Sequence, residues 1–145
     1  MENRMRITYR SDQAQIHWGD LCGIYEIAPL GTRNPDDLET VFSNSMFKCF
    51  VFADTKIIGA GRALADGVSC AYICDVALHP DYHGLGIGKK LVQMLVEQCK
   101  HHSKIILYAN PGKEGFYGKL GFRKMKTAMA IFKNEEKAIR DGFVS

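Results

Sequence analysis

The chain has 145 residues, of which 46% are hydrophobic and 24% charged, and its formal net charge is +3 at pH 7. This length and composition suit one core, so we expect residues 1–145 to form a single domain. The weakly basic charge, without a dense Lys/Arg block or zinc-finger spacing, argues against nucleic acid as a partner.

Short apolar runs argue against a membrane segment, and Met1–Arg10 lacks the apolar stretch of a signal peptide, so a cytoplasmic protein is expected. Five cysteines lie within apolar segments, and no two of them form a CxxC pair. This pattern predicts reduced thiols that belong mostly to the core, and it predicts no metal site. The cysteines are Cys22, Cys49, Cys70, Cys74 and Cys99.

The N-terminal part predicts a strand followed by a helix. Arg4–Tyr9 alternates in polarity as a half-buried strand does. Apolar residues recur at helical spacing within Asp12–Ile27, so we expect a helix there. Because glycine weakens a helix, an interruption is predicted near Gly19 and Gly23.

Capping residues predict a second, short helix. Asn34 is a good N-cap, and Pro35 suits the first helical position. Leu38, Val41 and Phe42 follow at helical spacing, so this helix should extend at least through Phe42.

Three strands are expected next, in an antiparallel meander. Phe47–Ala53 is rich in aromatic and β-branched residues, and the turn Asp54–Lys56 leads into a second strand, Ile57–Leu64. Val68–Leu78 is a long apolar strand. His79-Pro80 should end it, because proline cannot donate to the ladder.

A helix and a parallel strand follow a glycine-rich turn. The helix should be largely buried, and Lys104–Ala109 is a short strand behind it. Strand, helix and strand in succession predict a parallel pairing through a crossover. The helical face is marked by Ile87, Leu91, Met94, Leu95 and Gln98, and is widened by Val92, Val96 and Cys99.

The C-terminal part predicts a short helix, a strand and a final small helix. These are Lys113–Leu120, which Gly121 ends, then Lys124–Lys133, and a helix capped by Asn134. The whole chain therefore predicts an α+β fold, with a mixed sheet and helices on both of its faces.

Three glycines between the long strand and the buried helix predict a phosphate site. Gly84, Gly86 and Gly88 permit positive φ and a close approach of a ligand to the backbone. The helix N-terminus adds unpaired N–H groups and a partial positive charge. Lys89 and Lys90 oppose the helix dipole, so an anionic ligand would compensate for them.

Three other interpretations of this turn can be weighed against a phosphate site. A tight strand-to-helix turn without a ligand is the simplest one. A dinucleotide site would need GxGxxG with a carboxylate some 20 residues further on, whereas the spacing here is GxGxG. A P-loop is excluded because GxxxxGK[ST] does not occur.

Two motifs resemble the GNAT superfamily of N-acetyltransferases. Asp75–Leu91 is similar to the family's acetyl-CoA motif, and Asn110 with Gly115–Phe122 resembles its second signature. The order of elements fits over about residues 4–133. One departure is His83, where the family usually has Gln or Arg.

The resemblance implies a cofactor site for acetyl-CoA. Backbone groups of the central strand, Val76–Leu78 with Ala77 between them, would bond the pantetheine arm. Asn110, Phe116 and Tyr117 would contact the cofactor from the next elements, and the sheet would splay to admit it. The pyrophosphate would be held by His83, Gly84, Leu85, Gly86, Ile87, Gly88 and Lys89.

Amide formation needs an acid for the departing thiolate and a base for the ammonium. Tyr117 is expected to be the acid, since a phenol holds its proton more tightly than a thiol does. Asp75 is the first candidate for the base, because a lone carboxylate in an apolar strand needs a reason. It could equally be a structural carboxylate or a counter-charge for the substrate ammonium. His79 is the weaker candidate for the base, and His101 and His102 are expected at the surface.

The acceptor pocket is expected between the N-terminal helices and the last strands. The aromatic residues there are as readily core residues as substrate contacts, and Glu26 or Asp75 could meet a cation. The candidates for the pocket are Trp18, Tyr25, Glu26, Phe42, Tyr72, Asp75 and Phe116.

These observations predict an acyltransferase that moves an acetyl group from acetyl-CoA to a primary amine. The compact helix pair favours a small acceptor, such as an arylalkylamine, a polyamine or an amino sugar. A protein N-terminal or lysine acetyltransferase is the alternative, and a non-catalytic acetyl-CoA sensor is a further one. The resemblance also implies homodimerisation as an option.

Overall fold

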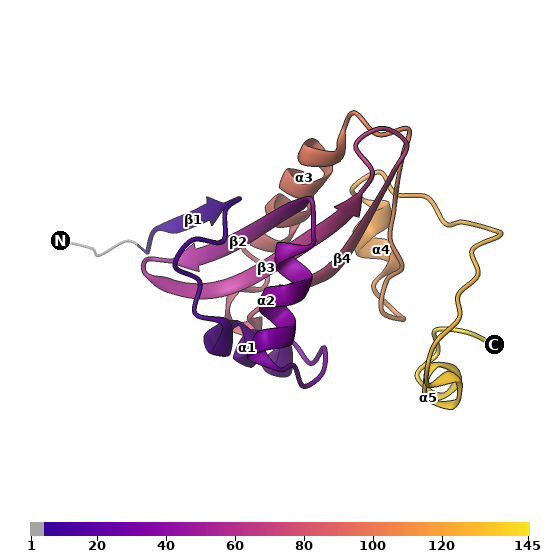
Figure 1. The fold of residues 1–145 in the computed structure, drawn as a ribbon, viewed down its shortest axis with the longest axis horizontal. Coiled ribbons are helices and arrows are strands. Elements are labelled where there is room, and N and C mark those ends of the chain that lie inside the picture. The colour runs from indigo at the N-terminus through magenta and orange to yellow at the C-terminus, as the bar shows by residue number, and fades with distance from the viewer. Residues whose placement is uncertain (1–4) are drawn as a thin grey trace. The chain divides into compact units, whose positions relative to one another are not determined.

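The computed structural model describes residues 5–145, which form two compact units that divide after Leu107 (Figure 1). The second unit holds α4 (Glu114–Gly118) and α5 (Glu135–Arg140). The first unit contains β1 (Ile7–Arg10), α1 (Trp18–Ile27), α2 (Pro35–Ser43), β2 (Phe47–Ala53), β3 (Lys56–Ala65), β4 (Cys70–Leu78), the 3-10 turn η1 (Pro80–Tyr82), α3 (Ile87–Cys99) and β5 (Lys104–Ile106).

The sheet of the first unit follows the predicted topology. Its strands lie in chain order from β1 to β5. The first four pair antiparallel in succession, whereas β5 pairs parallel with β4 after the α3 crossover. The expected meander, the parallel pairing and the α+β fold class are confirmed.

Helices cover both faces of this sheet, as Figure 1 shows with α2 in front and α3 behind. Phe50 and Ala60 lie in one buried cluster with Leu21 of α1. On the opposite face, a Cβ on Gly61 of β3 would lie only 2.7 Å from Cδ1 of Leu95 in α3. Glycine at this position therefore lets α3 approach the strand closely.

The first strand and helix differ from the predicted boundaries. β1 covers Ile7–Arg10, and Arg4, where the predicted strand began, lies outside the described residues. The helix begins at Trp18, because the Asp12 carboxylate accepts a hydrogen bond from the Ala14 N–H and holds a local turn.

The predicted interruption of α1 at its glycines is wrong. α1 runs unbroken through Gly19 and Gly23, both of which are exposed. The opposite side of the helix buries Leu21, Ile24 and Tyr25 in the core, so tertiary packing outweighs the low helix propensity of glycine.

Capping at the second helix is confirmed. The Asn34 side chain accepts hydrogen bonds from the N–H groups of Asp36 and Asp37, and Pro35 is the first residue of α2. These bonds satisfy backbone donors that would otherwise lack partners at the helix start. They also fix the loop that brings Arg33 toward the sheet.

The last predicted strand is wrong. Lys124–Lys133 is irregular in the structure, and the side chains of Met129 and Ile131 are 96% and 102% exposed. A strand needs a partner for its backbone groups, and residues 108–145 contain no strand to supply one. The final helix is confirmed, since Asn134 caps α5 by accepting from the Lys137 N–H.

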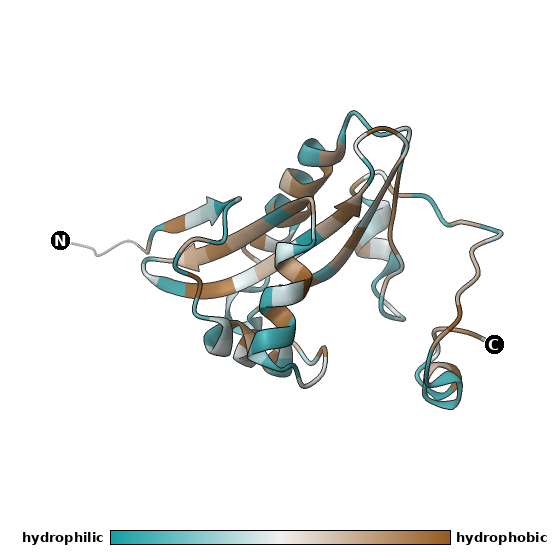
Figure 2. Ribbon diagram, in the orientation of Figure 1, coloured by the Kyte–Doolittle hydropathy of each residue, from teal (hydrophilic) through white to brown (hydrophobic). Residues whose placement is uncertain are grey.

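The distribution of hydropathy matches this arrangement. Figure 2 shows the most hydrophobic residues along the strands of the sheet and along the extended segment before α5. Cys22, Cys49 and Cys99 are buried, as predicted for core thiols, while Cys70 and Cys74 are partly exposed. None of the helices within residues 5–145 is both long and apolar enough to cross a bilayer.

Candidate active site

One edge of β4 is open beyond the start of β5. β4 pairs with β5 over Cys70–Tyr72. From Ile73 to Leu78 it has β3 on one side and, among residues 5–145, no strand on the other. The unpaired edge places backbone groups where an extended ligand could add to the sheet.

A bulge lies within this open part of β4. Ala60 pairs with Ala77 and Arg62 pairs with Cys74, so Gly61 alone faces both Asp75 and Val76. Asp75 adopts φ 55°, in the left-handed region that is uncommon for residues other than glycine. The extra residue reorients the side chains that follow Cys74.

The glycine turn has the conformation that was predicted for it. Gly84 and Gly86 have φ of 79° and 78°, and a Cβ at either position would meet nothing within 4 Å. Gly86 is the N-cap of α3, and no side chain of the described residues caps this helix. Its first N–H groups are thus available to an anion, and Leu85 beside them is 63% exposed.

Two lysines follow in the first turn of α3, and they differ in surroundings. Lys89 is exposed, whereas Nζ of Lys90 lies 4.6 Å from the ring centroid of Tyr9 in β1. A cation over an aromatic face is a stabilising contact. Lys89 is therefore the better candidate to reach a phosphate.

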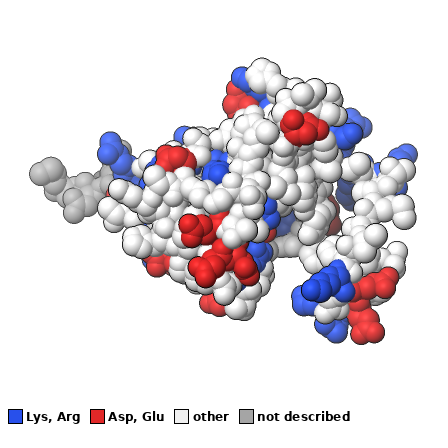
Figure 3. All heavy atoms as spheres, in the orientation of Figure 1, with Lys and Arg blue, Asp and Glu red and all other residues white. Residues whose placement is uncertain are grey.

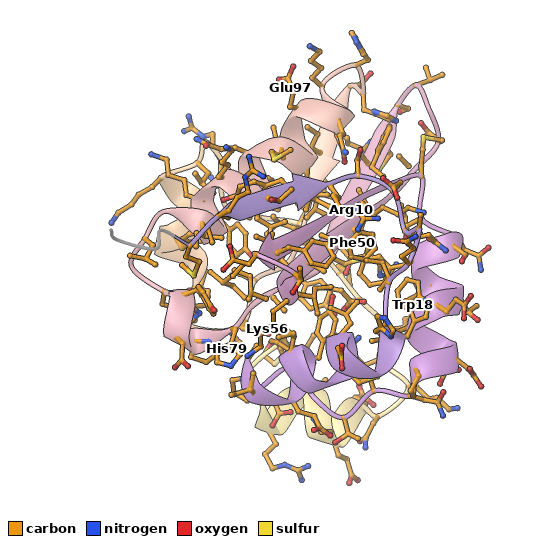
Figure 4. The ribbon with its side chains drawn as sticks, turned by 90° about the vertical axis from the view of Figure 1, so that its left-hand side faces the viewer. Arg10, Trp18, Phe50, Lys56, His79 and Glu97 are labelled. Carbon is orange, nitrogen blue, oxygen red and sulfur yellow. The ribbon has the colours of Figure 1, made fainter. Side chains whose placement is uncertain are left out.

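Histidines flank the short turn between β4 and the glycines. Nδ1 of His79, which Figure 4 labels, accepts a hydrogen bond from the Asp81 N–H at 3.1 Å and caps η1. Nε2 of His83 lies 3.2 Å from the Leu78 carbonyl oxygen, to which it can only donate. His83 thus ties the start of the glycine turn to the open edge of β4, and His79 is a turn residue.

Both oxygens of the Asp75 carboxylate are engaged by arginines. Oδ2 accepts from Nε of Arg62 at 2.8 Å, and Oδ1 accepts from Nη2 of Arg33 at 3.2 Å. Burial alone would raise the pKa of Asp75, but the hydrogen bonds and charges of the two arginines hold it below its ordinary value. A carboxylate with a lowered pKa is a weak base, so these contacts favour the structural alternative for Asp75.

Further contacts fix the two guanidinium groups. Arg33 also donates to the Leu30 carbonyl at 3.1 Å, and its Cζ lies 4.7 Å from the ring centroid of Tyr25. Arg62 also donates from Nη1 to Oγ of Ser45 at 3.2 Å. The network therefore joins the loop before α2, the end of α2, β3 and the bulge of β4.

Several predicted pocket residues belong to the interior. Tyr25 is fully buried, and its hydroxyl donates to the Asp75 carbonyl at 2.5 Å, so its ring has no surface for a substrate. Trp18 packs against Phe42 and Phe50, with ring centroids 5.7 and 6.1 Å apart, and Figure 4 shows Trp18 and Phe50 on neighbouring elements. These aromatic side chains fit the core interpretation.

The other predicted substrate contacts are more accessible. Glu26 is exposed on α1, and Tyr72 is partly buried on β4, two residues before Cys74. Burial raises the pKa of Cys74 to about 11, so this thiol stays protonated at neutral pH and is no nucleophile. Within residues 5–145, no cluster of His, Cys, Asp and Glu side chains is arranged to hold a metal ion.

The second unit carries the remaining predicted residues. Asn110 is exposed, and Phe116 is 40% exposed. Tyr117, in α4, packs edge-on against Phe116 and Phe122, with ring centroids 5.1 and 6.0 Å apart. Burial raises the pKa of Tyr117, so the phenol keeps its proton at neutral pH, as an acid must.

Two functional candidates could not be found from their sequence neighbours alone. Arg33 and Arg62 partner Asp75, and a signal for Arg62 existed, because it is the one charged residue inside Ile57–Ala65. His102, which was expected at the surface, is partly buried and accepts from the Gly67 N–H at 3.0 Å, which is a structural contact.

The comparison with protein families agrees with this geometry. The model of the acetyltransferase (GNAT) family matches residues 12–122, which include the bulge of β4, the glycine turn and Tyr117. The chain belongs to the GNAT family. Members of this family are acetyltransferases that use acetyl-CoA as the acyl donor.

Curated relatives are N-acetyltransferases. The chain is 43% identical over 74 residues to ycf52 of Pyropia yezoensis, which is 50% of this chain and 42% of that protein. For ycf52 of Gracilaria tenuistipitata var. liui the identity is 40% over 120 residues, covering 79% of this chain and 66% of the relative. Serotonin N-acetyltransferase 2, chloroplastic, of Oryza sativa subsp. japonica is 42% identical over 67 residues, covering 45% and 34%. The matches thus span less than two thirds of these relatives.

Solved structures share the fold at low sequence identity. A GNAT family acetyltransferase of Streptococcus pneumoniae superposes with a TM-score of 0.73 at 23% identity, covering 89% of this chain and 100% of the other. Glucosamine-6-phosphate N-acetyltransferase of Arabidopsis thaliana gives a TM-score of 0.68 at 20% identity, covering 89% and 99%. These likenesses establish the GNAT fold.

Proposed function

We propose that this GNAT enzyme transfers the acetyl group of acetyl-CoA to the primary amine of a small molecule, by direct attack in a ternary complex. The proposal rests on the start of α3, which follows Gly84 and Gly86 in the chain and has no side-chain cap. This helix start lies next to the open edge of β4. Open space at both glycines fits a pyrophosphate against backbone N–H groups. The edge from Ile73 to Leu78 fits an extended pantetheine arm.

The residues of the chain would take the following roles in the reaction. The neutral amine nitrogen forms a bond to the carbonyl carbon, the carbon–sulfur bond breaks, and the thiolate takes a proton from Tyr117. The proton that the acylated nitrogen then loses would return to the phenolate through water. The Val76 N–H, at the bulge, would polarise the thioester carbonyl. Since Asp75 is held by two arginines, we assign removal of the ammonium proton to water rather than to this carboxylate.

The Leu78 carbonyl has a role in this proposal through His83. The His83 ring donates to that carbonyl and uses one of its two lone pairs, so the Leu78 N–H and the second lone pair stay available to the pantetheine arm. The ring also fixes the distance between the β4 edge and the phosphate turn. His83 would thereby replace the usual Gln or Arg without a loss of the cradle.

An acceptor screen tests the proposal. Release of free thiol from acetyl-CoA is followed with a library of small amines and, in parallel, with peptides that carry free α-amines or lysines. Turnover of small amines supports the proposal, whereas turnover of peptides alone would move the assignment to a protein acetyltransferase. Tight binding of acetyl-CoA with no acceptor in either set would support a sensor that regulates a partner.

The single-domain organisation, the homodimer and the cytoplasmic location remain proposals. The plant relative from Oryza sativa is named chloroplastic, and that name makes a plastid the alternative compartment to test by imaging of a tagged chain.

A further inference from the structure

Two guanidinium groups lie at the bulge where the acceptor amine must react. We propose that Arg33 and Arg62 form an oxyanion-binding subsite, which selects amines that carry a carboxylate or phosphate group near the amino group. This inference rests on the proposed function, because it assigns the acceptor class to the same site. It favours amino acids and amino sugar phosphates over polyamines and plain arylalkylamines.

The hydrogen bonds leave donors of both arginines unused. A guanidinium carries five N–H donors in a planar fork. Arg33 makes two side-chain hydrogen bonds in the structure, to Leu30 and Asp75, and Arg62 makes two, to Asp75 and Ser45. Among residues 5–145 their remaining donors have no partner, and a planar oxyanion can accept from such a fork in pairs.

The unused donors are open to solvent although the side chains are largely buried. The side chain of Arg62 is only 13% exposed and that of Arg33 is 28% exposed. Within residues 5–145, Gln98 is the one residue with a buried side-chain polar atom that lacks a partner, so the unused guanidinium donors reach water and can reach a ligand. A ligand oxyanion could accept from them without requiring the arginines to move, because Asp75, Tyr25 and Ser45 already hold them.

The local charge is positive. Asp75 neutralises one of the two guanidinium charges, and Glu26, an exposed acidic residue on α1, forms no ion pair with either arginine. Figure 3 shows acidic side chains over α1 and α2 at the surface. Asp36 and Asp37 of α2 are exposed, so water screens their charges. The subsite thus repels a polycation and attracts an anion.

The position suits an acceptor rather than the cofactor. Arg62 lies on the sheet face that α1 and α2 cover, because it pairs with Cys74 and bonds to Ser45 at the end of α2. Leu64 and Tyr72 form the neighbouring pair on that face. Leu64, which lies beside the arginine, is 40% exposed. An acceptor could place an apolar body there and its anionic group on the guanidinium groups.

Matched acceptor pairs test this inference on the full chain. We would measure kcat/KM by thiol release for L-phenylalanine against 2-phenylethylamine, for glucosamine 6-phosphate against glucosamine, and for spermidine. The anionic member of at least one pair should be preferred by about 10-fold or more, which is the worth of hydrogen bonds to a charged group. Comparing the two pairs distinguishes carboxylate from phosphate.

Variants then assign the preference to the arginines. Arg33→Gln should abolish the preference, read as the ratio of kcat/KM between the anionic and the neutral member of a pair, so that any general loss of activity cancels. Arg33→Lys should keep only part of it, because an ammonium lacks the fork. Arg10→Gln is the control, since this partly exposed arginine on the same face pairs with Asp12.

The outcomes separate this inference from the function on which it rests. Equal rates for both members of each pair, a preference for spermidine, or a preference that survives Arg33→Gln would overturn the subsite alone. Failure of every small amine, with acetyl-CoA still bound, would overturn the proposed function as well. If Arg33→Gln lowers the melting temperature strongly, the wild-type comparison and Arg62→Lys still decide the matter.

Discussion

Substituting Gly86 by Asn and by Asp measures whether phosphate lies at the start of α3. The two side chains have almost the same shape, and both tolerate the left-handed backbone better than other residues. Gly86 has φ 78° and ψ 4°, and a Cβ there meets nothing within 4 Å, so both should fit. Each should cost about 1 kcal/mol of backbone strain, which for a chain of this size lowers the melting temperature by about 3 °C.

The variants differ in one negative charge. A carboxylate about 5 Å from a phosphate charge raises the free energy of binding by about 1–3 kcal/mol at effective dielectric constants between about 80 and about 20. The Kd of Gly86→Asp for acetyl-CoA should therefore exceed that of Gly86→Asn by about 5- to 150-fold. The free protein should show the reverse order, because a negative charge at a helix N-terminus stabilises the fold.

Isothermal titration calorimetry with acetyl-CoA gives both affinities, and thermal unfolding gives both stabilities. Repeating the titration at about 1 M salt should shrink the difference, since the Debye length there is about 3 Å. Equal Kd values for the two variants, at low salt and with both folded, would show that the phosphates bind elsewhere. A weaker Asp variant that is also less stable would point to a distorted turn instead.

Three more predictions concern the acid, the packing and the network. Tyr117→Phe should slow turnover by about 100-fold or more with little change in acetyl-CoA affinity; an unaltered rate removes the phenol from the mechanism. Gly61→Ala should lower the free energy of unfolding by about 1–3 kcal/mol, because the new Cβ lies 2.7 Å from Leu95, whereas Gly23→Ala on the exposed side of α1 should raise it by about 0.5–1 kcal/mol. Since the pKa of Asp75 is lowered in the folded state, its ionised form stabilises the fold above about pH 4, and this stabilisation is lost as the pH falls below that value. The difference in melting temperature between wild type and Asp75→Asn should therefore close on acidification. A difference that stays constant argues against the ion pairs.

The sequence predicted the elements that local signals specify. The β2–β3 hairpin follows from aromatic and β-branched residues around a short turn, and α2 follows from Asn34 and Pro35. The start of α1 was missed because Asp12 competes for the backbone through its own side chain. The strand predicted at Lys124–Lys133 has suitable residues, but pairing is a tertiary property that no local pattern contains.

One part of the candidate site could likewise be predicted from local sequence signals, and another part could not. The glycine turn could be predicted, because positive φ at Gly84 and Gly86 is a property of single residues. The partners of Asp75 could not, because Arg33 and Arg62 are 42 and 13 positions away along the chain. Their contact depends on the register of β3 with β4, which the bulge shifts.

That bulge accounts for the left-handed conformation of Asp75. In a regular strand Asp75 would follow Cys74 onto the opposite face, where Leu95 of α3 is fully buried, and an unpaired carboxylate there would cost several kcal/mol. The left-handed conformation of Asp75 costs about 1 kcal/mol and returns the side chain to the face of Arg62. Val76 then takes the α3 face, since its Cγ2 lies 3.3 Å from a Cβ placed on Gly61. The strained residue therefore keeps the charged side of the sheet, where Arg33 and Arg62 lie, apart from the apolar packing of α3, and it leaves the Val76 backbone between them.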